Sequence, residues 1–448
     1  MQSLSGKLVT VFGLGRFGGG IAVTRWLAGQ GAHVLVTDQE PPEKLADSIN
    51  QLAGLNVEFR LGRQSVEDFT QAELIVASPA VPPHNLFLSA ARDAGVAITT
   101  EIRLFIERCP AKIFAITGTK GKSTTTAMLG LLLATRRATH IGGNIGGSLL
   151  EKLRNITPND HVVLELSSYM LEHLKVDCWS PHVALVTMLD ADHLEWHGSR
   201  EAYVDAKKNI LRFQKPDDWA ILNGRDPGAA ALATECHGQV VQYGLDESRP
   251  FNLQIPGAHN QINAQGAFAA AQIAGVDWAA AQDVLGKFRG LPHRLQLVHS
   301  VGGVRWYNDS IATIPQAAIV ALESFEPRKV IQIVGGKDKH LHFEQMCSIL
   351  LRRAKAILCI GATGTMLADT LTRARVGTEP QVYHCGDLQT AVDRARTIAV
   401  SGDVILMSPG YPSYDQFSNF EQRGNLFTEL ARRADNASDP AGPKQPPA

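Results

Sequence analysis

One segment, AITGTKGKSTTT at residues 115–126, constrains the fold more than any other. A short apolar run ends there in glycines, lysines and a row of hydroxyl residues, and a helix-like segment follows. Glycines let backbone N–H groups close around phosphate oxygens, and the first turn of a helix adds positive potential. The spacing GxxGKS is two residues shorter than the common GxxxxGK[ST], but it keeps the parts that a cradle needs. The segment predicts a nucleotide phosphate loop, in which Lys122 reaches the terminal phosphates and Ser123 can ligate Mg²⁺.

Apolar runs alternate with helix-like segments along most of the chain, which favours parallel sheets covered by helices on both faces. The clearest predicted strands are residues 7–12, 33–38, 112–117, 161–168, 183–189, 329–336, 356–361 and 403–410. With 448 residues, the chain is too long for one ordinary core. We therefore predict an α/β protein of three domains. They are a Rossmann-like domain at 1–108, a central P-loop-type ATPase with a mostly parallel sheet at 109–290, and a Rossmann-like domain at 291–435, followed by a disordered tail at 436–448.

Composition excludes several classes of protein. A net charge of −1 provides neither a basic surface for nucleic acid nor an acidic tail. The sequence has no apolar stretch of about 18 residues and no secretion leader, so we expect a cytoplasmic protein that contacts no membrane. The cysteines lack CxxC spacing, which favours buried, reduced thiols over disulfides or a zinc site. They are Cys109, Cys178, Cys236, Cys347, Cys359 and Cys385.

A second glycine pattern follows the first apolar run. Gly13, Gly15 and Gly18 form GxGxxG, and Asp38 ends the next apolar run 20 residues after Gly18. This spacing is typical of a dinucleotide site, in which the acid holds a ribose hydroxyl. A tight glycine turn in any doubly wound domain gives the same pattern. Because the loop at 115–126 is the stronger nucleotide motif, the glycines alone do not establish an NAD site.

Charged side chains follow later apolar runs, at the ends where parallel sheets bind ligands. Glu165 can supply an oxygen ligand to Mg²⁺, although a carboxylate at a strand end can also simply face water. Asp192 and His193 follow another run. A lone histidine is often structural, but beside an acid it is a candidate contact to metal or phosphate. Lys207 and Lys208 lie on a helix-like segment, where by themselves they are typical of a solvated basic turn.

Together these features resemble the Mur ligases, a family of ATP-dependent enzymes that form amide bonds in peptidoglycan synthesis. The resemblance covers nearly the whole chain, and its final motif is very specific. Besides TGTxGKST, the motifs are GGNIG at 142–146, ELSS at 165–168, DH at 192–193, YxxAK at 203–207, HNxxNA at 259–264, LPHR at 291–294, YNDS at 307–310 and SPGYPSYDQFSNFEQRGNLF at 408–427.

The resemblance implies that the N-terminal domain binds UDP rather than NAD, and that the C-terminal domain binds the incoming amino acid. It implies ATP contacts from Gly118, Thr119, Lys120, Gly121, Lys122, Ser123, Thr124, Asn263, Arg294 and Asp309. It implies UDP-sugar contacts from Gly15, Arg16, Phe17, Asp38, Ser78, Asn144, Ser167 and His193, and glutamate contacts from Thr313, Lys339, Ser413 and Phe420. Two Mg²⁺ ions would be held by Ser123, Glu165, His193 and Lys207, the last carried as an N-carbamate whose oxygen suits a hard cation.

The final motif is most similar to the branch of the family that adds D-glutamate to UDP-N-acetylmuramoyl-L-alanine. The implied reaction has two steps, with Lys122, His193 and Lys207 as catalytic residues. The substrate carboxylate attacks the γ-phosphate of ATP and forms an acyl phosphate, whose carbonyl the amine of glutamate then attacks. The implied partners are these small molecules alone, bound by a monomer. Domain closure would bring the amino acid to the nucleotide sugar.

Five positions depart from the family pattern. Lys120, Met170, Met188, Ile311 and Glu40 stand where the family usually has asparagine, glutamine, asparagine, a cation and arginine, respectively. The departures leave open a variant ligase that adds L-glutamate or uses an altered nucleotide sugar, and also a non-catalytic relative. A NAD-dependent dehydrogenase leaves most of the motifs unexplained. We hypothesise that Lys120 partly replaces the positive charge that Ile311 lacks; the alternative is that its side chain points to solvent.

Overall fold

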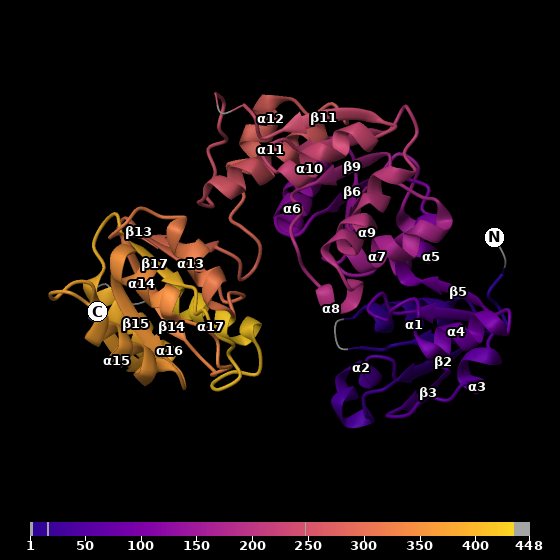
Figure 1. The fold of residues 1–448 in the computed structure, drawn as a ribbon, viewed down its shortest axis with the longest axis horizontal. Coiled ribbons are helices and arrows are strands. Elements are labelled where there is room, and N and C mark those ends of the chain that lie inside the picture. Colours follow the sequence, from indigo (N-terminus) through magenta and orange to yellow (C-terminus); the bar gives the residue numbers. More distant parts are fainter. Residues whose placement is uncertain (1–2, 16–17, 247, 434–448) are drawn as a thin grey trace, which may run out of the picture. The chain divides into compact units, whose positions relative to one another are not determined.

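Three sheets organise the residues that the computed structural model describes, which are 3–15, 18–246 and 248–433 (Figure 1). The chain forms two compact units, one of residues 1–251 with 262–284 and the other of residues 252–261 with 285–448. The first unit contains two of the sheets and the second unit contains the third. This α/β architecture with mostly parallel strands confirms the predicted fold class. The domain boundaries at 108 and 290 stay a prediction.

The first sheet has the strand order β3-β2-β1-β4-β5, and all its strand pairs are parallel. Its strands are β1 (Leu8–Phe12), β2 (His33–Asp38), β3 (Val57–Leu61), β4 (Leu74–Ala77) and β5 (Ala97–Thr100). Its helices are α1 (Gly19–Gly29), α2 (Ala46–Asn50), α3 (Glu67–Thr70), α4 (Leu86–Asp93) and α5 (Glu101–Arg108), with the 3₁₀ turn η1 (Pro42–Lys44). The chain crosses from β3 at one edge to β4 on the other side of β1. At such a switch point the loops after β1 and β4 diverge and leave room for a ligand.

The second sheet has the order β11-β10-β9-β6-β8-β7 and is also parallel throughout. Its strands are β6 (Lys112–Thr117), β7 (Thr139–Gly143), β8 (His161–Glu165), β9 (Val183–Val186), β10 (Trp219–Asn223) and β11 (Gln239–Tyr243). Its helices are α6 (Lys122–Ala134), α7 (Ser168–Leu174), α8 (Leu194–His197), α9 (Arg200–Arg212), α10 (Pro227–Ala231), α11 (Ala258–Gln272) and α12 (Trp278–Leu285), with the 3₁₀ turns η2 (Leu150–Asn155), η3 (Lys175–Asp177) and η4 (Leu232–Glu235). β8 and β9 are buried at every position, as strands covered on both faces must be. Because β8 and β9 flank β6, the loops after these three strands share one edge of the sheet.

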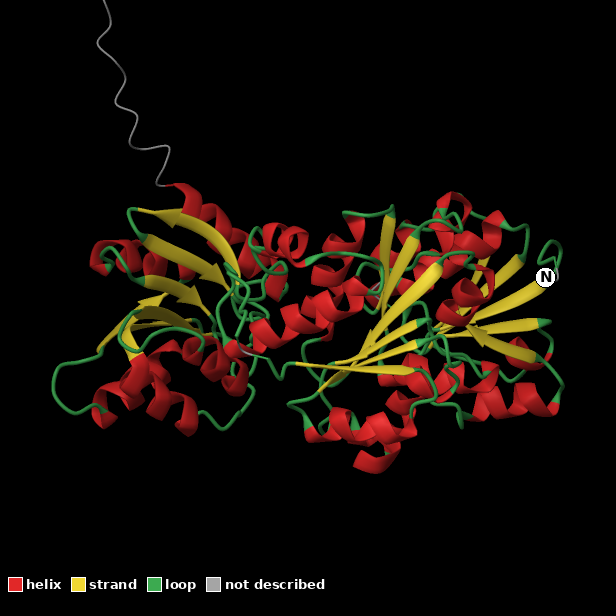
Figure 2. Cartoon of the chain, turned by 90° about the horizontal axis from the view of Figure 1, so that it is seen from above, coloured by secondary structure: helices red, strands yellow, loops and turns green. Residues whose placement is uncertain are grey.

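The third sheet has the order β12-β13-β17-β14-β15-β16. Its strands are β12 (Gln296–Val301), β13 (Val304–Asn308), β14 (Val330–Gly335), β15 (Ala354–Ile360), β16 (Gln381–Gly386) and β17 (Val404–Met407). Its helices are α13 (Pro315–Glu323), α14 (Glu344–Arg353), α15 (Gly364–Ala374), α16 (Leu388–Ile398) and α17 (Phe420–Arg432). β12 at the edge is antiparallel to β13, and the other pairs are parallel. Helices cover both faces of the strands (Figure 2).

Two sequence expectations concern membranes and thiols. Within the described ranges, no helix is long and apolar enough to cross a lipid bilayer. All six cysteines are free thiols, and Cys347 and Cys359 are buried as predicted. Cys178 is exposed, so the expectation of burial is wrong there. It ends the short turn η3 in a left-handed conformation with φ 48°, at the surface rather than in a core.

Candidate active site

The phosphate loop lies between β6 and α6, as predicted, and its glycines are sterically required. Gly118 has φ 146° and Gly121 has φ 84°, both in a region that favours glycine. A Cβ atom on Gly118 would lie 1.9 Å from the Oγ1 of Thr187, and one on Gly121 would lie 2.5 Å from the Oδ1 of Asn263. Any other residue at these two positions would therefore be strained and would force a neighbouring group to shift. The contact also places Asn263, a predicted ATP residue on α11, beside the loop.

The loop is held against the segment that follows β9. The backbone N–H of Thr119 donates to the carbonyl of Met188 at 2.7 Å, and its hydroxyl donates to the carbonyl of Asp190 at 3.1 Å. The hydroxyl of Thr187 donates to the carbonyl of Lys120 at 2.6 Å. The backbone of Lys120 is thus fixed, while its side chain is exposed. Met188 contributes to this contact through its backbone carbonyl oxygen. Because every residue type has that oxygen, the replacement of asparagine by methionine at position 188 leaves this hydrogen bond intact.

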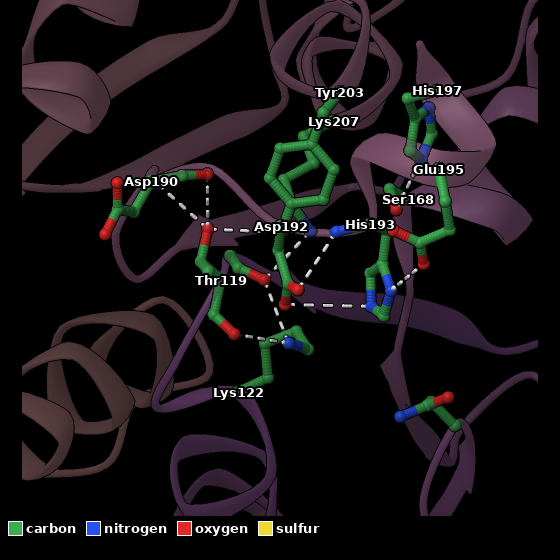
Figure 3. Close-up of polar contacts among 12 residues, drawn as sticks. Thr119, Lys122, Ser168, Asp190, Asp192, His193, Glu195, His197, Tyr203 and Lys207 are labelled. Carbon is green, nitrogen blue, oxygen red and sulfur yellow. Dashed lines mark hydrogen bonds and ion pairs between the residues drawn. The ribbon is translucent and has the colours of Figure 1, made fainter. Parts of the chain in front are cut away.

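Two lysines converge on one carbonyl oxygen of this loop (Figure 3). The Nζ of Lys122 donates to the carbonyls of Gly118 at 2.9 Å and Thr119 at 3.0 Å. The Nζ of Lys207 on α9 donates to Gly118 at 2.8 Å. Lys207 is only 2% exposed, so the interpretation of this segment as a solvated basic turn is wrong for it. That description fits Lys208, whose Nζ pairs with a carboxylate oxygen of Glu235 at 2.6 Å.

The surroundings of Lys207 disfavour its charged form. Burial lowers the pKa of Lys207 well below its usual range, and the nearby charge of Lys122 lowers it further, against the opposing carboxylates of Asp192 and Glu165. The Nζ also lies 4.7 Å from the centroid of the Tyr203 ring. A buried amine with a lowered pKa is more often neutral, and only the neutral amine can react with CO₂.

Glu165 is the clearest candidate ligand for a metal ion. It is 1% exposed, and its Oε1 accepts a hydrogen bond from the Nδ2 of Asn144 at 2.7 Å. Its Oε2 is buried and has no hydrogen-bond partner among the described residues, which suits an oxygen reserved for a hard cation. His193 is 43% exposed and lies 3.7 Å from both Asp192 and Glu195. In the described part of the chain, no three His, Cys, Asp or Glu side chains gather as a metal site, so Mg²⁺ would need further oxygens from phosphate, Ser123 or a modified Lys207.

A cleft of about 830 Å³ opens between the first and second sheets of the first unit. It brings together most of the residues predicted to contact the UDP-sugar, which are Gly15, Asp38, Ser78, Asn144 and Ser167. Met170, which stands where the family usually has a glutamine, also lines it. Tyr169 lines it too and carries no prediction from the sequence, because nothing in its residue type indicates a ligand. Arg16 and Phe17 lie outside the described residues. His193 instead packs beside Tyr169, with ring centroids 5.0 Å apart.

Asp38 has a structural role at the mouth of this cleft. Its Oδ2 accepts hydrogen bonds from the backbone N–H groups of Leu14 at 2.9 Å and Gly15 at 3.1 Å, and its Oδ1 accepts one from Glu40 at 3.0 Å. The carboxylate that a dinucleotide site would use for a ribose hydroxyl is therefore engaged by the glycine loop itself. This argues against the NAD interpretation of the glycine pattern.

In the second unit, predicted site residues follow three neighbouring parallel strands. Asp309 follows β13, Lys339 lies beyond β14 and Ser413 lies beyond β17, so they belong to one edge of the third sheet. Asp309 is buried and accepts hydrogen bonds from the backbone N–H of Leu295 at 3.0 Å and the hydroxyl of Ser408 at 2.6 Å. Burial raises the pKa of Asp309 to about 7, against both hydrogen bonds and the charge of Arg294. Lys339 is exposed, Ser413 is buried, and Thr313 and Phe420 are half-buried.

Sequence reasoning gave no role to Arg423, which organises the loops at this edge. Its side chain is 1% exposed and lies within the motif at 408–427. The guanidinium donates to the hydroxyl of Ser310 at 3.0 Å, to the carbonyl of Ser310 at 2.9 Å and to the carbonyl of Tyr411 at 3.0 Å. Burial lowers the pKa of Arg423 to about 10, and Asp415 opposes this shift. Its position inside the most specific motif, at residues 408–427, was the one feature of the sequence that could have indicated a role for this arginine.

Three family models match the chain, and together they span most of it. They are a Mur ligase MurD-like N-terminal domain at residues 7–100, a Mur ligase middle domain at 116–250, and a Mur ligase glutamate ligase domain at 293–410. Curated relatives with the name UDP-N-acetylmuramoylalanine–D-glutamate ligase match nearly the full chain, and two of them illustrate this. The one from Roseiflexus sp. strain RS-1 is 39% identical and covers 96% of this chain and 99% of the relative. The one from Symbiobacterium thermophilum is 36% identical and covers 92% and 95%.

Solved structures show the same fold at lower sequence identity. The UDP-N-acetylmuramate-alanine ligase from Thermotoga maritima has a TM-score of 0.58 at 21% identity and covers 96% of this chain and 100% of that chain. A MurF structure from Acinetobacter baumannii has a TM-score of 0.56 at 18% identity, covering 80% and 90%. At these identities the likeness concerns the fold alone.

Proposed function

This chain belongs to the Mur ligase family, and on that premise we propose that it joins D-glutamate to UDP-N-acetylmuramoyl-L-alanine with ATP, in the synthesis of peptidoglycan precursors. The relatives that bear this name match nearly the full length of the chain. One structural observation carries the proposal. Asn144 lines the cleft and also donates to Glu165, so the candidate nucleotide-sugar site directly adjoins the candidate metal ligand beside the phosphate loop.

The first chemical step joins two anions, and the site supplies positive charge where they meet. A carboxylate oxygen of the nucleotide sugar bonds to the γ-phosphorus of ATP, the bond to the β-phosphate oxygen breaks, and ADP leaves with its electron pair. Lys122 would hold the phosphates through its ammonium group, and backbone N–H groups of the loop other than that of Thr119, which donates to Met188, would surround them. In the second step the neutral amine of glutamate attacks the acyl carbonyl. Phosphate leaves, and the amine proton passes to solvent or phosphate.

Mg²⁺ would be held by the free Oε2 of Glu165, with Ser123, His193 and a carbamylated Lys207. When bound, the ion neutralises the phosphate oxygens and the incoming carboxylate. Carbamylation joins the neutral Lys207 amine to CO₂ and releases one proton. The lowered pKa of Lys207 supports this assignment, because it increases the share of the amine that can react. The modification also places an anion beside Lys122.

We assign the glutamate end of the reaction to the second unit, through Thr313, Lys339, Ser413 and Phe420. Support comes from their common position at the carboxyl edge of the third sheet, where open α/β sheets bind ligands. Arg294 and Asp309 belong to the same edge and are assigned to ATP. Asp309 is engaged by Leu295 and Ser408, so its role includes fixing the backbone there.

The exposed side chain of Lys120 remains a candidate source of positive charge for the phosphates. Its backbone is fixed by Thr187, so its ammonium group stays attached to a rigid loop. We propose that it strengthens the binding of anionic substrates. Lys120→Asn should raise the KM for ATP or for the nucleotide sugar, while Lys112→Asn, at the exposed opposite end of β6, should not. Unchanged kcat and KM values in Lys120→Asn would reject this role.

One assay tests the function. The protein is incubated with ATP, Mg²⁺ and UDP-N-acetylmuramoyl-L-alanine, with D- or L-glutamate supplied separately, and phosphate release and product mass are measured. We expect turnover with D-glutamate only, and none with a Lys122→Ala variant. Turnover with L-glutamate would establish the variant ligase instead. No turnover with either isomer, in the presence of binding, would favour a non-catalytic relative. We also infer a cytoplasmic monomer, which light scattering of the purified protein tests for its oligomeric state.

A further inference from the structure

Four aromatic side chains connect the cleft with the phosphate loop inside the first unit. They are Tyr169, Trp196, His197 and Tyr203, which we call the aromatic bridge. Tyr169 lines the cleft. Its ring is nearly parallel to that of His197, with an interplanar angle of 2° and centroids 5.7 Å apart. On the other side, the His197 ring meets the Tyr203 ring edge-on, with centroids 5.3 Å apart. His197 therefore lies between the two tyrosines.

Hydrogen bonds join the aromatic bridge both to the phosphate loop and to segments that line the cleft. Tyr203 donates from its hydroxyl to the Oγ1 of Thr119 in the phosphate loop at 3.1 Å, and its ring lies over Lys207. At the cleft, the Nε2 of His197 and the Oγ of Ser168 are hydrogen-bonded at 2.9 Å (Figure 3). Ser168 is buried and begins α7, directly after the cleft residue Ser167. The indole Nε1 of Trp196 donates to the carbonyl of Ala80, which also lines the cleft.

The bridge is built from rigid groups in close contact. Aromatic rings in edge-on and stacked contact resist rotation, because turning one ring pushes against its neighbours. A ligand that shifts Tyr169 or the start of α7 must then move or hold His197. A change in His197 is passed to Tyr203 and from there to Thr119 and Lys207. Coupling of this kind needs contacts at both ends that change when a ligand binds. The candidates are the hydrogen bond from Tyr203 to Thr119 at the loop and the ring of Tyr169 in the cleft.

We propose that His197 is a positioning residue that couples occupation of the cleft to the conformation of the phosphate loop. The nucleotide sugar in the cleft sets the position of His197, and His197 sets the position of Tyr203 against Thr119. ATP therefore binds more tightly when the nucleotide sugar is present. This inference rests on the proposed function for the identity of the two ligands, and it adds a residue that no catalytic step requires.

The test measures the dissociation constant of a non-hydrolysable ATP analogue with Mg²⁺ by calorimetry on the full chain. The measurement is made with and without saturating UDP-N-acetylmuramoyl-L-alanine. We expect the parent chain to bind the analogue about 5-fold or more tightly when the cleft is occupied. In His197→Ala this ratio should fall to about 1, while each ligand alone binds within about 3-fold of its parent value. A parent ratio of 1, or a parental ratio in His197→Ala, would overturn the proposal.

Two further variants separate the hydrogen bond from the ring. Ser168→Ala and His197→Phe both remove the bond at 2.9 Å but keep an aromatic ring against Tyr203. They should give the same intermediate ratio. His182→Ala is the matched control. It also replaces a hydrogen-bonded histidine, whose Nδ1 lies 3.0 Å from Asp218, but this histidine is not part of the aromatic bridge. It should keep the parent ratio. A ratio as low in His182→Ala as in His197→Ala would mean general destabilisation and would reject the assignment.

Failure of this inference is distinguishable from failure of the proposed function. Turnover with D-glutamate, together with equal analogue affinities in the parent chain, would reject the coupling alone. Coupled binding without turnover would reject the ligase function alone. Absence of any binding of the nucleotide sugar would reject both.

Discussion

The Nζ of Lys207 donates a hydrogen bond of 2.8 Å to the carbonyl oxygen of Gly118, the same oxygen that accepts one of 2.9 Å from Lys122. Two amines thus share one acceptor in a place where Lys207 is almost fully buried. If both were cations, they would repel each other in surroundings with little solvent to screen them. The proposed conversion of Lys207 to a carbamate would relieve that repulsion and would supply an oxygen ligand for a metal ion.

The first prediction concerns the chemical state of Lys207. Lys207→Ala should lower turnover by roughly 100-fold or more, because a charged group that acts on the reacting phosphates is lost. Formate or acetate should restore part of the rate, since a short carboxylate can occupy the space and replace the carbamate oxygens. Phosphate release measured across a range of acetate concentrations checks this.

Lys208→Ala is the control for Lys207. Its side chain makes an ion pair with Glu235 at the surface, where such pairs contribute little. Turnover of Lys208→Ala should stay within about 2-fold of the parent, with no response to acetate. Rescue of Lys208→Ala instead, or no rescue of Lys207→Ala, would contradict the assignment of the carbamate to Lys207.

The second prediction concerns the pH dependence of stability through Asp309. Burial raises its pKa to about 7, whereas an aspartate in an unfolded chain titrates near about 4. At pH values between these two pKa values, Asp309 holds a proton in the folded state that it has lost in the unfolded state. Stability from this group therefore falls as pH rises from about 4 to about 7, with a slope of at most about 1.4 kcal/mol per pH unit.

Asp309→Asn tests this, because the amide has the same shape and does not titrate. Urea unfolding of both proteins at pH 5 and pH 8 gives the difference between their midpoints. We expect the variant to gain stability relative to the parent as pH rises, since only the parent must bury a charge at pH 8. A difference that is equal at both pH values would show that Asp309 titrates normally.

Much of the fold could be predicted because the central strands are buried on both faces. β6, β8 and β9 are nearly continuous apolar runs, and such runs are read directly from the sequence. Edge strands were not individually predicted. β3 alternates half-buried and exposed residues, and β11 is mostly exposed, so neither stands out from a polar loop. The antiparallel direction of β12 was not predicted, although the two glycines between β12 and β13, Gly302 and Gly303, are a local signal for a hairpin.

The candidate site could be predicted where backbone geometry dictates residue type. Gly118 and Gly121 are such positions, and the loop was recognised from them. The roles of side chains of common types were harder to predict from the sequence. Lys207 and Lys208 are adjacent, and only their roughly 100° separation around α9 decides that Lys207 is buried and Lys208 half-buried. Asp38 matched a ribose-binding pattern, but its oxygens are used by nearby backbone N–H groups, which no spacing rule reveals.

The third prediction concerns the glycine at the start of α6. Gly121→Ala introduces a Cβ atom 2.5 Å from the Oδ1 of Asn263, in a backbone conformation with φ 84°. Either the side chain of Asn263 or the loop must shift to relieve the contact, which disturbs a predicted ATP contact or the N–H groups that would hold phosphate. We expect the affinity for ATP, measured by calorimetry, to fall by roughly 10-fold or more.

Gly54→Ala separates backbone strain from the contact. Gly54 also has φ 84°, but nothing lies within 4 Å of the added Cβ. Both variants should lose about 1–2 kcal/mol from the left-handed conformation, while only Gly121→Ala should lose nucleotide affinity. Equal ATP affinities in the two variants would show that the loop tolerates the methyl group.

The last prediction concerns Arg423 as the side chain that holds the loops of the second unit together. Arg423→Ala leaves the carbonyls of Ser310 and Tyr411 buried without their donor. Each unsatisfied buried group costs about 1–3 kcal/mol, so the free energy of unfolding should fall by roughly 3 kcal/mol in urea titrations. Because Ser413 and Phe420 lie in the same loop system, the KM for glutamate should rise as well.

Arg433→Ala is the control. Arg433 directly follows the same helix, and its loss removes only an exposed ion pair with Glu429, so stability should change by no more than about 0.5 kcal/mol. Equal stabilities of the two variants would mean that water replaces the guanidinium of Arg423 at no cost.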